Sequence, residues 1–344
     1  MPRGGRFHAL SPTLESAMRH ALGEGGQVIL FLNRRGFSTH LHCPACGYVE
    51  QCKFCDLALT FHRRREVALC HHCGYEIPPP DKCPKCGQAQ VRFQGTGTEK
   101  LHLEVEEKFS GFVARRMDSD TMKRPGSHAK LLGEFRRGEV HILVGTQMIA
   151  KGLDFPNVTL VGVINADIGL HLPDFRAAER TFQLLSQVAG RTGRGPRGGK
   201  VLVQTYSMDH PGIVLAAAHQ YEPFAAIELG HRREHNYPPY HRMARIVVKS
   251  RKQEEVAAFA ERLAGGFRVA LEKLKGPAGD PAPLRLLGPA EAPVFRLKGY
   301  YRYHFQLQSP SPGALHQLLR QVMGTVRAGH GVDVAVDIDP QDML

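Results

Sequence analysis

The stretch CPACGYVEQCKFCDLALTFHRRREVALCHHCGYEIPPPDKCPKC, residues 43–86, holds all 8 cysteines of the 344-residue chain. They form Cys-x-x-Cys pairs: Cys43/Cys46, Cys52/Cys55, Cys70/Cys73 and Cys83/Cys86. A Cys-x-x-Cys turn presents two thiolates to one metal ion, and structural Zn²⁺ takes four such ligands tetrahedrally. The pairs therefore predict two zinc sites with no cysteine left over. Because this segment has too few apolar residues for a core, each site is expected to supply about 10 to 16 kcal/mol of folding free energy.

The pairs can combine in two ways. In a nested arrangement, one site uses the inner ligands Cys52, Cys55, Cys70 and Cys73, and the other uses the outer ligands Cys43, Cys46, Cys83 and Cys86. The alternative joins pairs that are neighbours in sequence, but its first site leaves only residues 47–51 between the two turns. We favour nesting. His71 and His72 are expected to be exposed, since four thiolates are already available for each metal.

Other uses of the cysteines fit less well. Disulfides would suit a small secreted protein, but the chain is long and its first residues, 1–6, contain no apolar signal segment, so a reducing cytoplasm is expected. A redox-active Cys-x-x-Cys usually comes as a single pair that opens a helix. A zinc hydrolase is also disfavoured, because a closed shell of four thiolates leaves no position for a catalytic water.

The charge of the chain points to a polyanionic partner. Lys and Arg number 45 against 33 Asp and Glu, a formal net charge of +12. Basic residues cluster at 63–65, 136–137 and 191–197. A polyanion is the natural partner of such a chain, and a solvated basic surface is the alternative. No apolar run approaches the roughly 20 residues of a membrane span.

Outside the cysteines, strand patterns alternate with helix patterns as far as residue 236. The apolar run Val28-Ile-Leu-Phe-Leu32 is typical of a strand buried on both faces, and Ser11-Pro12 predicts the start of a helix that ends near Gly23. Further strands are expected at 112–115, 141–144, 158–164 and 201–206, and further helices at 98–109, 127–137 and 174–190. This order predicts a doubly wound α/β domain, residues 1–42 and 91–236, that a zinc-binding insert, residues 43–90, interrupts.

The pattern changes after Tyr237-Pro-Pro-Tyr240. Strands are expected at 243–249, at 284–287 with 294–297, at 300–308 and at 332–337, with helices at 253–274 and 314–327. The order β-α-β-β-α-β predicts a small ferredoxin-like α+β domain over residues 237–344.

Three segments carry candidate chemistry, and two of them follow expected strands, where open α/β sheets bind ligands. Arg34 and Arg35 follow the strand 28–32. The second segment, which follows the strand 141–144, reads Thr-Gln-Met-x-x-Lys-Gly-x-Asp-Phe-Pro from Thr146. The third reads Gln-x-x-Gly-Arg-x-Gly-Arg from Gln187, so Arg191 and Arg194 can share one helical turn and present a guanidinium fork to phosphate.

These segments, in this order, resemble motifs IV, V and VI of superfamily 2 helicases. Together with the cysteine-rich insert and Pro-Asp-Phe-Arg-Ala-Ala-Glu-Arg from Pro173, they resemble the PriA family of primosomal replication-restart helicases from Leu10 to the C-terminus. The resemblance implies a RecA-like second lobe, nested zinc sites and a C-terminal domain that binds branched DNA. The residue roles that it implies are ATP sensing by Gln187, Arg191 and Arg194, coupling by Gly152 and Asp154, and contact with DNA by Thr146, Gln147, Arg34 and Arg35.

The activity that the resemblance implies is ATP-dependent 3′→5′ unwinding of DNA at stalled replication forks, with promotion of primosome assembly. The implied cofactors are two Zn²⁺ and ATP with Mg²⁺. The implied partners are branched and single-stranded DNA, primosome proteins, single-stranded-DNA-binding protein and the replicative helicase, with no membrane and a cytoplasmic location.

The sequence departs from this family pattern: we find neither the P-loop (Walker A) nor the acidic Walker B motif that holds Mg²⁺. Gly199-Lys200 is followed by Val201 where Ser or Thr is required. Residues 95–100 have the wrong spacing and are expected to form a turn and helix cap. The chain is therefore expected to be a C-terminal portion that binds ATP jointly with a lobe it lacks and is inactive alone. A non-enzymatic, zinc-containing DNA-binding module is the alternative.

Overall fold

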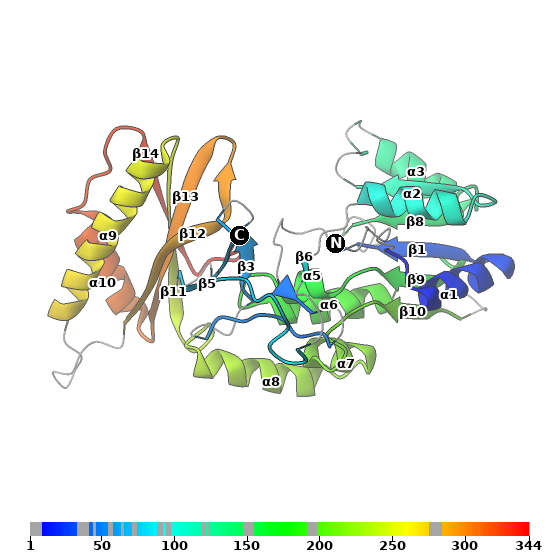
Figure 1. Ribbon diagram of the computed structural model, residues 1–344, viewed down its shortest axis with the longest axis horizontal. Helices are drawn as coiled ribbons and strands as arrows, with labels where there is room; N and C mark the ends of the chain where they lie inside the picture. Colours follow the sequence, from blue (N-terminus) through cyan, green and yellow to red (C-terminus); the bar gives the residue numbers. More distant parts are fainter. Residues whose placement is uncertain are drawn as a thin grey trace. The chain divides into compact units, whose positions relative to one another are not determined.

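A computed structural model describes most of the chain, and its elements are labelled in Figure 1. The described residues are 9–32, 41–43, 46–53, 58–62, 65–70, 74–87, 92–93, 98–118, 121–122, 124, 126–146, 155–190, 198–274 and 284–343. The chain divides into two compact units. The first unit comprises residues 1–35, 94–170 and 178–224, and the second comprises residues 36–93, 171–177 and 225–344.

The first unit contains a five-stranded parallel sheet with the strand order β10-β9-β1-β8-β7. Its strands are Gln27–Phe31 (β1), Ala114–Met117 (β7), Ile142–Gly145 (β8), Val158–Val163 (β9) and Lys200–Val203 (β10). The chain leaves this sheet after β1 and re-enters it at β7, so the cysteine-rich segment interrupts one α/β domain, as the sequence predicts.

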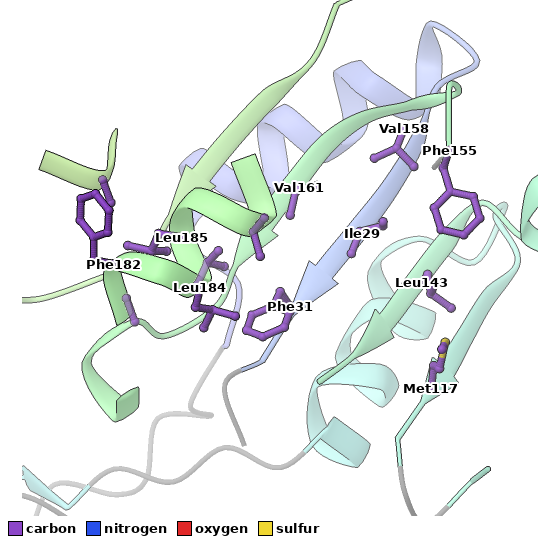
Figure 2. Close-up of a cluster of buried hydrophobic side chains, with 14 of the residues drawn as sticks. Ile29, Phe31, Met117, Leu143, Phe155, Val158, Val161, Phe182, Leu184 and Leu185 are labelled. Atoms are coloured by element: carbon purple, nitrogen blue, oxygen red, sulfur yellow. The ribbon is translucent and has the colours of Figure 1, made fainter. Parts of the chain in front are cut away.

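The side chains of β1 alternate between two apolar clusters, as expected for a strand that is covered on both sides. Val28, Leu30 and Leu32 pack in the cluster that contains Leu14 and Met18 of α1. Ile29 and Phe31 pack in the opposite cluster, with Phe182 and Leu185 of α6 (Figure 2). The continuous apolar run therefore has a core on each face of the sheet.

The helix α1 begins as its sequence predicts. The Ser11 hydroxyl accepts the backbone N–H of Leu14 at 3.2 Å, and Pro12 occupies the first turn. The other helices in this part of the chain are Thr98–Lys108 (α2), Ser127–Arg136 (α3), Asp167–Leu170 (α5), Ala177–Ala189 (α6), Pro211–Ala217 (α7) and Tyr221–Glu234 (α8). None of the described helices combines the length and apolar character needed to cross a bilayer.

The structure differs from the sequence prediction at several boundaries. β7 begins at Ala114 instead of residue 112. α6 begins at Ala177 instead of residue 174, because the Asp174 carboxylate accepts the Arg176 N–H at 2.9 Å and forms a turn there. Neither α7 nor α8 was predicted from the sequence. α7 starts where His210 caps the N–H of Gly212 at 3.0 Å, which is a less familiar cap than Ser or Asp.

The C-terminal part of the second unit is a four-stranded antiparallel sheet with the order β12-β13-β11-β14. Its elements are Arg242–Ser250 (β11), Gln253–Lys273 (α9), Arg285–Leu297 (β12), Tyr300–Ser309 (β13), Pro312–Met323 (α10) and Val332–Ile338 (β14). This order is that of the ferredoxin-like fold and confirms the prediction. α10 ends at Met323, before the predicted residue 327, where Gly324 caps it.

The strands that the structure describes in the cysteine-rich insert are short. They are Leu41–His42 (β2), Thr60–His62 (β3), Val67–Leu69 (β4), Glu76–Ile77 (β5) and Arg92–Phe93 (β6), in a two-stranded sheet β2-β6 and a three-stranded sheet β3-β4-β5. Its buried apolar cluster consists of Leu41, Cys52, Leu59, Ala68 and Cys70. So small a core needs another source of stability.

The insert contacts β12 of the C-terminal domain within the second unit. Arg65 Nη1 lies 3.0 Å from the Glu291 carboxylate, and a β-carbon at Gly74 would lie 3.5 Å from the Pro289 carbonyl oxygen. Glu291 is buried, and burial raises its pKa by more than the Arg65 charge lowers it. A half-exposed ion pair thus joins the insert to β12.

Candidate functional site

The outer cysteine pairs come together in the structure. The sulfur atoms of Cys43, Cys46, Cys83 and Cys86 all lie within 4.8 Å of one another. The Cys43 and Cys86 sulfurs are 3.7 Å apart, and those of Cys46 and Cys83 are 3.6 Å apart. Zn–S bonds of about 2.3 Å in a tetrahedron give S···S edges of about 3.8 Å. The donor set and its spacing therefore fit one Zn²⁺.

Local backbone geometry explains why these turns hold two sulfurs close together. The N–H of Gly47 donates to the Cys43 carbonyl, that of Gly74 to Cys70, and that of Gly87 to Cys83, each at 2.9 Å. All three glycines have a positive φ, between 69° and 78°. Glycine adopts this conformation without the steric cost that a β-carbon brings. In the outer pairs, these turns bring the sulfurs of Cys43, Cys46, Cys83 and Cys86 close enough together to surround one metal ion.

Electrostatics also favours a cation between these sulfurs. The pKa of the Cys46 thiol lies at about 12: the Tyr48 N–H lowers it, but burial and the sulfurs of Cys83, Cys86 and Cys43 together raise it by more. Four crowded sulfurs cannot all be thiolates at neutral pH unless a positive charge compensates them. A divalent metal would supply that charge.

The inner cysteine pairs are described only in part. Cys52 and Cys70 are buried in the same apolar cluster. Cys55 and Cys73, with His71 and His72, lie outside the described residues. The second zinc site therefore stays a prediction.

Two of the predicted helicase residues are among the described residues, and one of them, Thr146, lies at the carboxyl edge of the five-stranded sheet. Thr146 directly follows β8 and is partly exposed. Gln187 is exposed near the end of α6, whose buried side chains Phe182, Leu185 and Val188 anchor it to the sheet. The remaining predicted residues lie outside the described residues: Arg34, Arg35, Gln147, Gly152, Asp154, Arg191 and Arg194.

A buried carboxylate at this edge was missed by the sequence analysis. Asp167, just after β9, accepts the hydroxyls of Thr205 and Ser207 at 3.0 and 2.7 Å and the N–H of Tyr206 at 2.9 Å. It thereby ties the loop after β10 to the loop after β9. The available signal was an Asn165-Ala-Asp167 sequence directly after a buried strand, the place where such sheets bind ligands.

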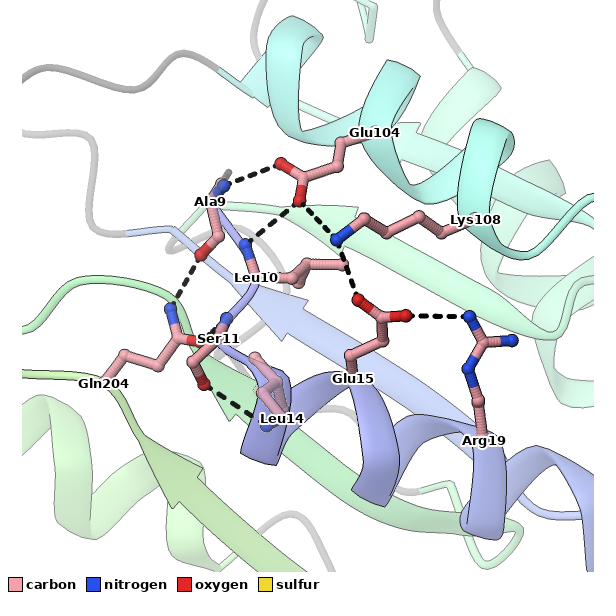
Figure 3. Close-up of polar contacts among 9 residues, drawn as sticks. All are labelled: Ala9, Leu10, Ser11, Leu14, Glu15, Arg19, Glu104, Lys108 and Gln204. Atoms are coloured by element: carbon pink, nitrogen blue, oxygen red, sulfur yellow. Dashed lines mark hydrogen bonds and ion pairs between the residues drawn. The ribbon is translucent and has the colours of Figure 1, made fainter. Parts of the chain in front are cut away.

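The segment that leads into α1 is held from two sides, as Figure 3 shows. Gln204, after β10, accepts the Ser11 N–H at 2.7 Å and donates to the Ala9 carbonyl at 2.8 Å. On the other side, Glu104 of α2 accepts the Ala9 N–H at 2.7 Å. A pocket of about 560 Å³ lies beside this segment, lined by Ser11, Asn165, Asp167, Gln204 and Tyr206 among others.

Lys108 completes this network with two ion pairs. Its ammonium lies 2.7 Å from Glu15 of α1 and 3.2 Å from Glu104. The hydrogen bond from Lys108, with a second from Arg19, lowers the pKa of Glu15. Charged contacts therefore join α1 to α2.

Three regions of the chain match known families. Residues 52–78 match the PriA DNA helicase Cys-rich region domain, residues 89–196 match the Helicase conserved C-terminal domain, and residues 233–341 match the Primosomal protein N C-terminal domain. The matches follow one another along the chain in the order insert, α/β lobe and α+β domain.

Curated relatives align with nearly the whole chain. It is 42% identical over 346 residues to the replication restart protein PriA of Bacillus subtilis, covering 99% of this chain and 42% of the relative. The PriA of Treponema pallidum is 40% identical, covering 97% of this chain and 50% of the relative, and that of Haemophilus influenzae is 37% identical, covering 98% and 45%. The chain thus spans about half the length of the curated relatives it matches.

Proposed function

This chain corresponds to the C-terminal portion of the PriA family of replication-restart helicases, and we propose that it forms the second lobe of an ATP-driven motor acting at stalled replication forks. In this proposal the complete machine unwinds DNA in the 3′→5′ direction and promotes primosome assembly. The partners that assembly requires are single-stranded-DNA-binding protein, primosome proteins and the replicative helicase.

One observation carries the proposal: a helicase C-terminal region, a cysteine-rich region and a primosomal C-terminal domain occur in one chain, on a parallel sheet that can present residues at its carboxyl edge. Gln187 stands on α6, four residues before Arg191. In the proposed site, Arg191 and Arg194 stabilise the charge that develops on the γ-phosphate, an effect worth roughly 10³- to 10⁵-fold in rate.

The remaining roles follow the same division between nucleotide and DNA. Gly152 and Asp154 couple the nucleotide site to strand movement. Thr146 and Gln147 contact the DNA backbone, and Arg34 and Arg35 lie near either ligand. ATP and Mg²⁺ bind jointly with a lobe that carries a P-loop.

Zinc has a structural role in this proposal. Cys43, Cys46, Cys83 and Cys86 would hold one Zn²⁺, and Cys52, Cys55, Cys70 and Cys73 a second. Bound zinc supplies folding free energy and no catalysis, because four thiolates close its coordination shell. The insert then serves as a stable platform for the displaced strand and for primosome proteins.

A chimera tests the motor role. The chain replaces the matching portion of the Bacillus subtilis relative, and ATP hydrolysis is measured with and without forked DNA. We expect DNA-stimulated turnover in the chimera and none in the chain alone. Arg194→Ala should reduce kcat by about 10³-fold or more while fork binding is kept. Arg197→Ala, which removes the same charge from the same basic segment, is the matched control and should have little effect.

Two outcomes would count against the proposal. Turnover by the isolated chain equal to that of the chimera would contradict the need for a second lobe. Fork binding without ATP hydrolysis in the chimera would favour the alternative, a non-enzymatic DNA-binding module.

A further inference from the structure

The hairpin between β12 and β13, drawn in orange in Figure 1, has a solvent-exposed tip. Lys298 and Gly299 have φ values of 50° and 83°, the left-handed pair that forms a tight two-residue turn. Leu297, Lys298 and Gly299 are exposed, and Leu297 keeps 47% of its surface in solvent. The turn from β11 into α9 lies beside this tip, since Ser250 pairs with Tyr301.

Positive charge gathers at this tip, and carboxylates compensate only part of it among the described residues. No Asp or Glu occurs between residues 292 and 332. Lys249 and Lys252, on the neighbouring turn, pair with Asp333 at 3.5 Å and Glu255 at 2.6 Å. Among the described residues, no carboxylate pairs with Arg251, Arg296 or Lys298. These three exposed cations form the charged part of the surface, which we call the hairpin patch together with Tyr300 and Tyr301.

Aromatic rings alternate with these cations. Arg251 lies 5.3 Å from the centre of the Tyr300 ring, and Arg296 lies 5.1 Å from that of Tyr301. Tyr301 also packs against the apolar core of the domain, whereas Tyr300 is not among that core's residues. A guanidinium held against a ring is already positioned, so it loses little freedom when it meets a phosphate or a base.

We propose that the hairpin patch binds single-stranded DNA, with Tyr300 stacking an unpaired base and Arg251, Arg296 and Lys298 contacting the backbone. Stacking on a tyrosine needs an open base face, which a duplex buries between neighbouring pairs and a single strand offers. The patch therefore takes an unpaired strand in preference to a blunt duplex. This inference rests on the proposed function, because it takes DNA as the ligand. It adds to that function the surface that binds and the form of DNA that is bound.

The test uses the 344-residue chain loaded with zinc. Its affinity for a fluorescein-labelled oligo-dT and for a blunt duplex of equal length is measured by fluorescence anisotropy over a range of salt concentrations. Tyr300→Ala should weaken oligo-dT binding about tenfold with an unchanged salt dependence, because it removes stacking. Tyr300→Phe keeps the ring and should restore affinity. It also shows that loss in the alanine variant does not come from misfolding.

Charge removal should give a different signature. Lys298→Ala should reduce the slope of log affinity against log salt by about 0.7, the value for one lost phosphate contact on a single strand. Arg320→Gln on α10 is the matched control, since it removes an exposed charge from the same domain, and its slope should equal that of the parent.

The inference is overturned if Tyr300→Ala binds oligo-dT as tightly as the parent, or if the parent binds the blunt duplex as tightly as the single strand. Each result differs from failure of the proposed function, which is read from ATP hydrolysis in the chimera. A parent chain that binds neither DNA but binds an acidic peptide at this patch would also overturn it.

Discussion

The five-stranded α/β lobe and the cysteine-rich insert stand next to each other in sequence but reach stability by different means. The lobe buries two apolar clusters, one on each face of its sheet. In the part of the insert that the structure describes, the buried cluster consists of five residues, and two of them are cysteines. We expect burial of apolar surface to be the main source of stability in the lobe and thiolate–metal bonds to be the main source in the insert. The two regions should therefore respond to different perturbations.

Metal removal should give the largest difference between them. Zinc sites of this kind supply about 10 to 16 kcal/mol each, which exceeds what the small core of the insert can offer. We expect a chelator to abolish hydrogen-exchange protection across residues 41–93, while protection of β1, β8 and β9 is kept. Hydrogen–deuterium exchange with mass spectrometry measures both regions in one sample.

A single substitution should reproduce this effect. Cys83→Ser should lower the zinc content and expose the insert, whereas Lys85→Ser, between the ligands of the same turn, should leave both unchanged. An insert that stays protected without metal would contradict the comparison.

The lobe should respond most to loss of a buried ring. Phe135 of α3 is fully buried and meets Phe155 edge-to-face at 4.9 Å. Phe135→Ala should cost about 3 to 5 kcal/mol in the free energy of unfolding, through lost burial and the cavity left behind. Urea unfolding followed by circular dichroism measures this cost, and zinc content should not change. Arg136→Ala at the exposed neighbour is the control and should cost far less.

Two buried carboxylates should give the smallest but most specific contrast. Burial raises the pKa of Asp118 in the lobe, but hydrogen bonds from Thr98 and Thr121 and the charge of Arg116 lower it by more, so its folded pKa lies below 3.8. Its contribution is thus present above about pH 4 and is lost as the pH falls through the folded pKa. Glu291 of β12, which pairs with Arg65 of the insert, has the opposite shift: its folded pKa lies above 4.5, so its ionisation reduces stability as the pH rises through the folded pKa.

The matching variants should therefore diverge with pH. Asp118→Asn should cost on the order of 1 kcal/mol at pH 7, and the cost should shrink below pH 4. The free energy of unfolding of Glu291→Gln should increase relative to that of the parent as the pH rises above about 4.5. Unfolding free energies between pH 3.5 and 8, each taken as a difference from the parent, check both signs. The prediction would be contradicted if the differences in unfolding free energy from the parent changed with pH in the same way for both variants.

Local sequence patterns predicted the parts of the fold that depend on neighbouring residues. The apolar run in β1, the Ser11-Pro12 helix start and the β-α-β-β-α-β order of the C-terminal domain are all of this kind. The pattern failed where contacts between distant residues decide the structure. Asp167 bonds to Ser207, 40 residues later, and Arg65 meets Glu291 from a different domain.

In the candidate site, too, the residues marked by a local motif were predicted and those joined by distant contacts were not. The spacing of Cys43, Cys46, Cys83 and Cys86 was enough to predict which pairs converge, because each tight turn holds two sulfurs and nesting brings the ends of the insert together. The place of Asp167 after a buried strand was a signal, but the polar network around Asp167 and Gln204 was not predictable, because their partners Ser207 and Ser11 lie far away along the chain. The residues proposed to sense ATP, Arg191 and Arg194, stay predictions from the sequence.

The glycines that close the cysteine turns differ in how freely they can be exchanged over evolutionary time. Gly87 has open space where a β-carbon would sit, so asparagine, which tolerates a positive φ, can replace it. Gly74 has the same backbone conformation but faces Pro289 and Ala290. A β-carbon there would be in ordinary van der Waals contact with both residues, so a small residue fits at Gly74, whereas a longer side chain would have to extend along β12.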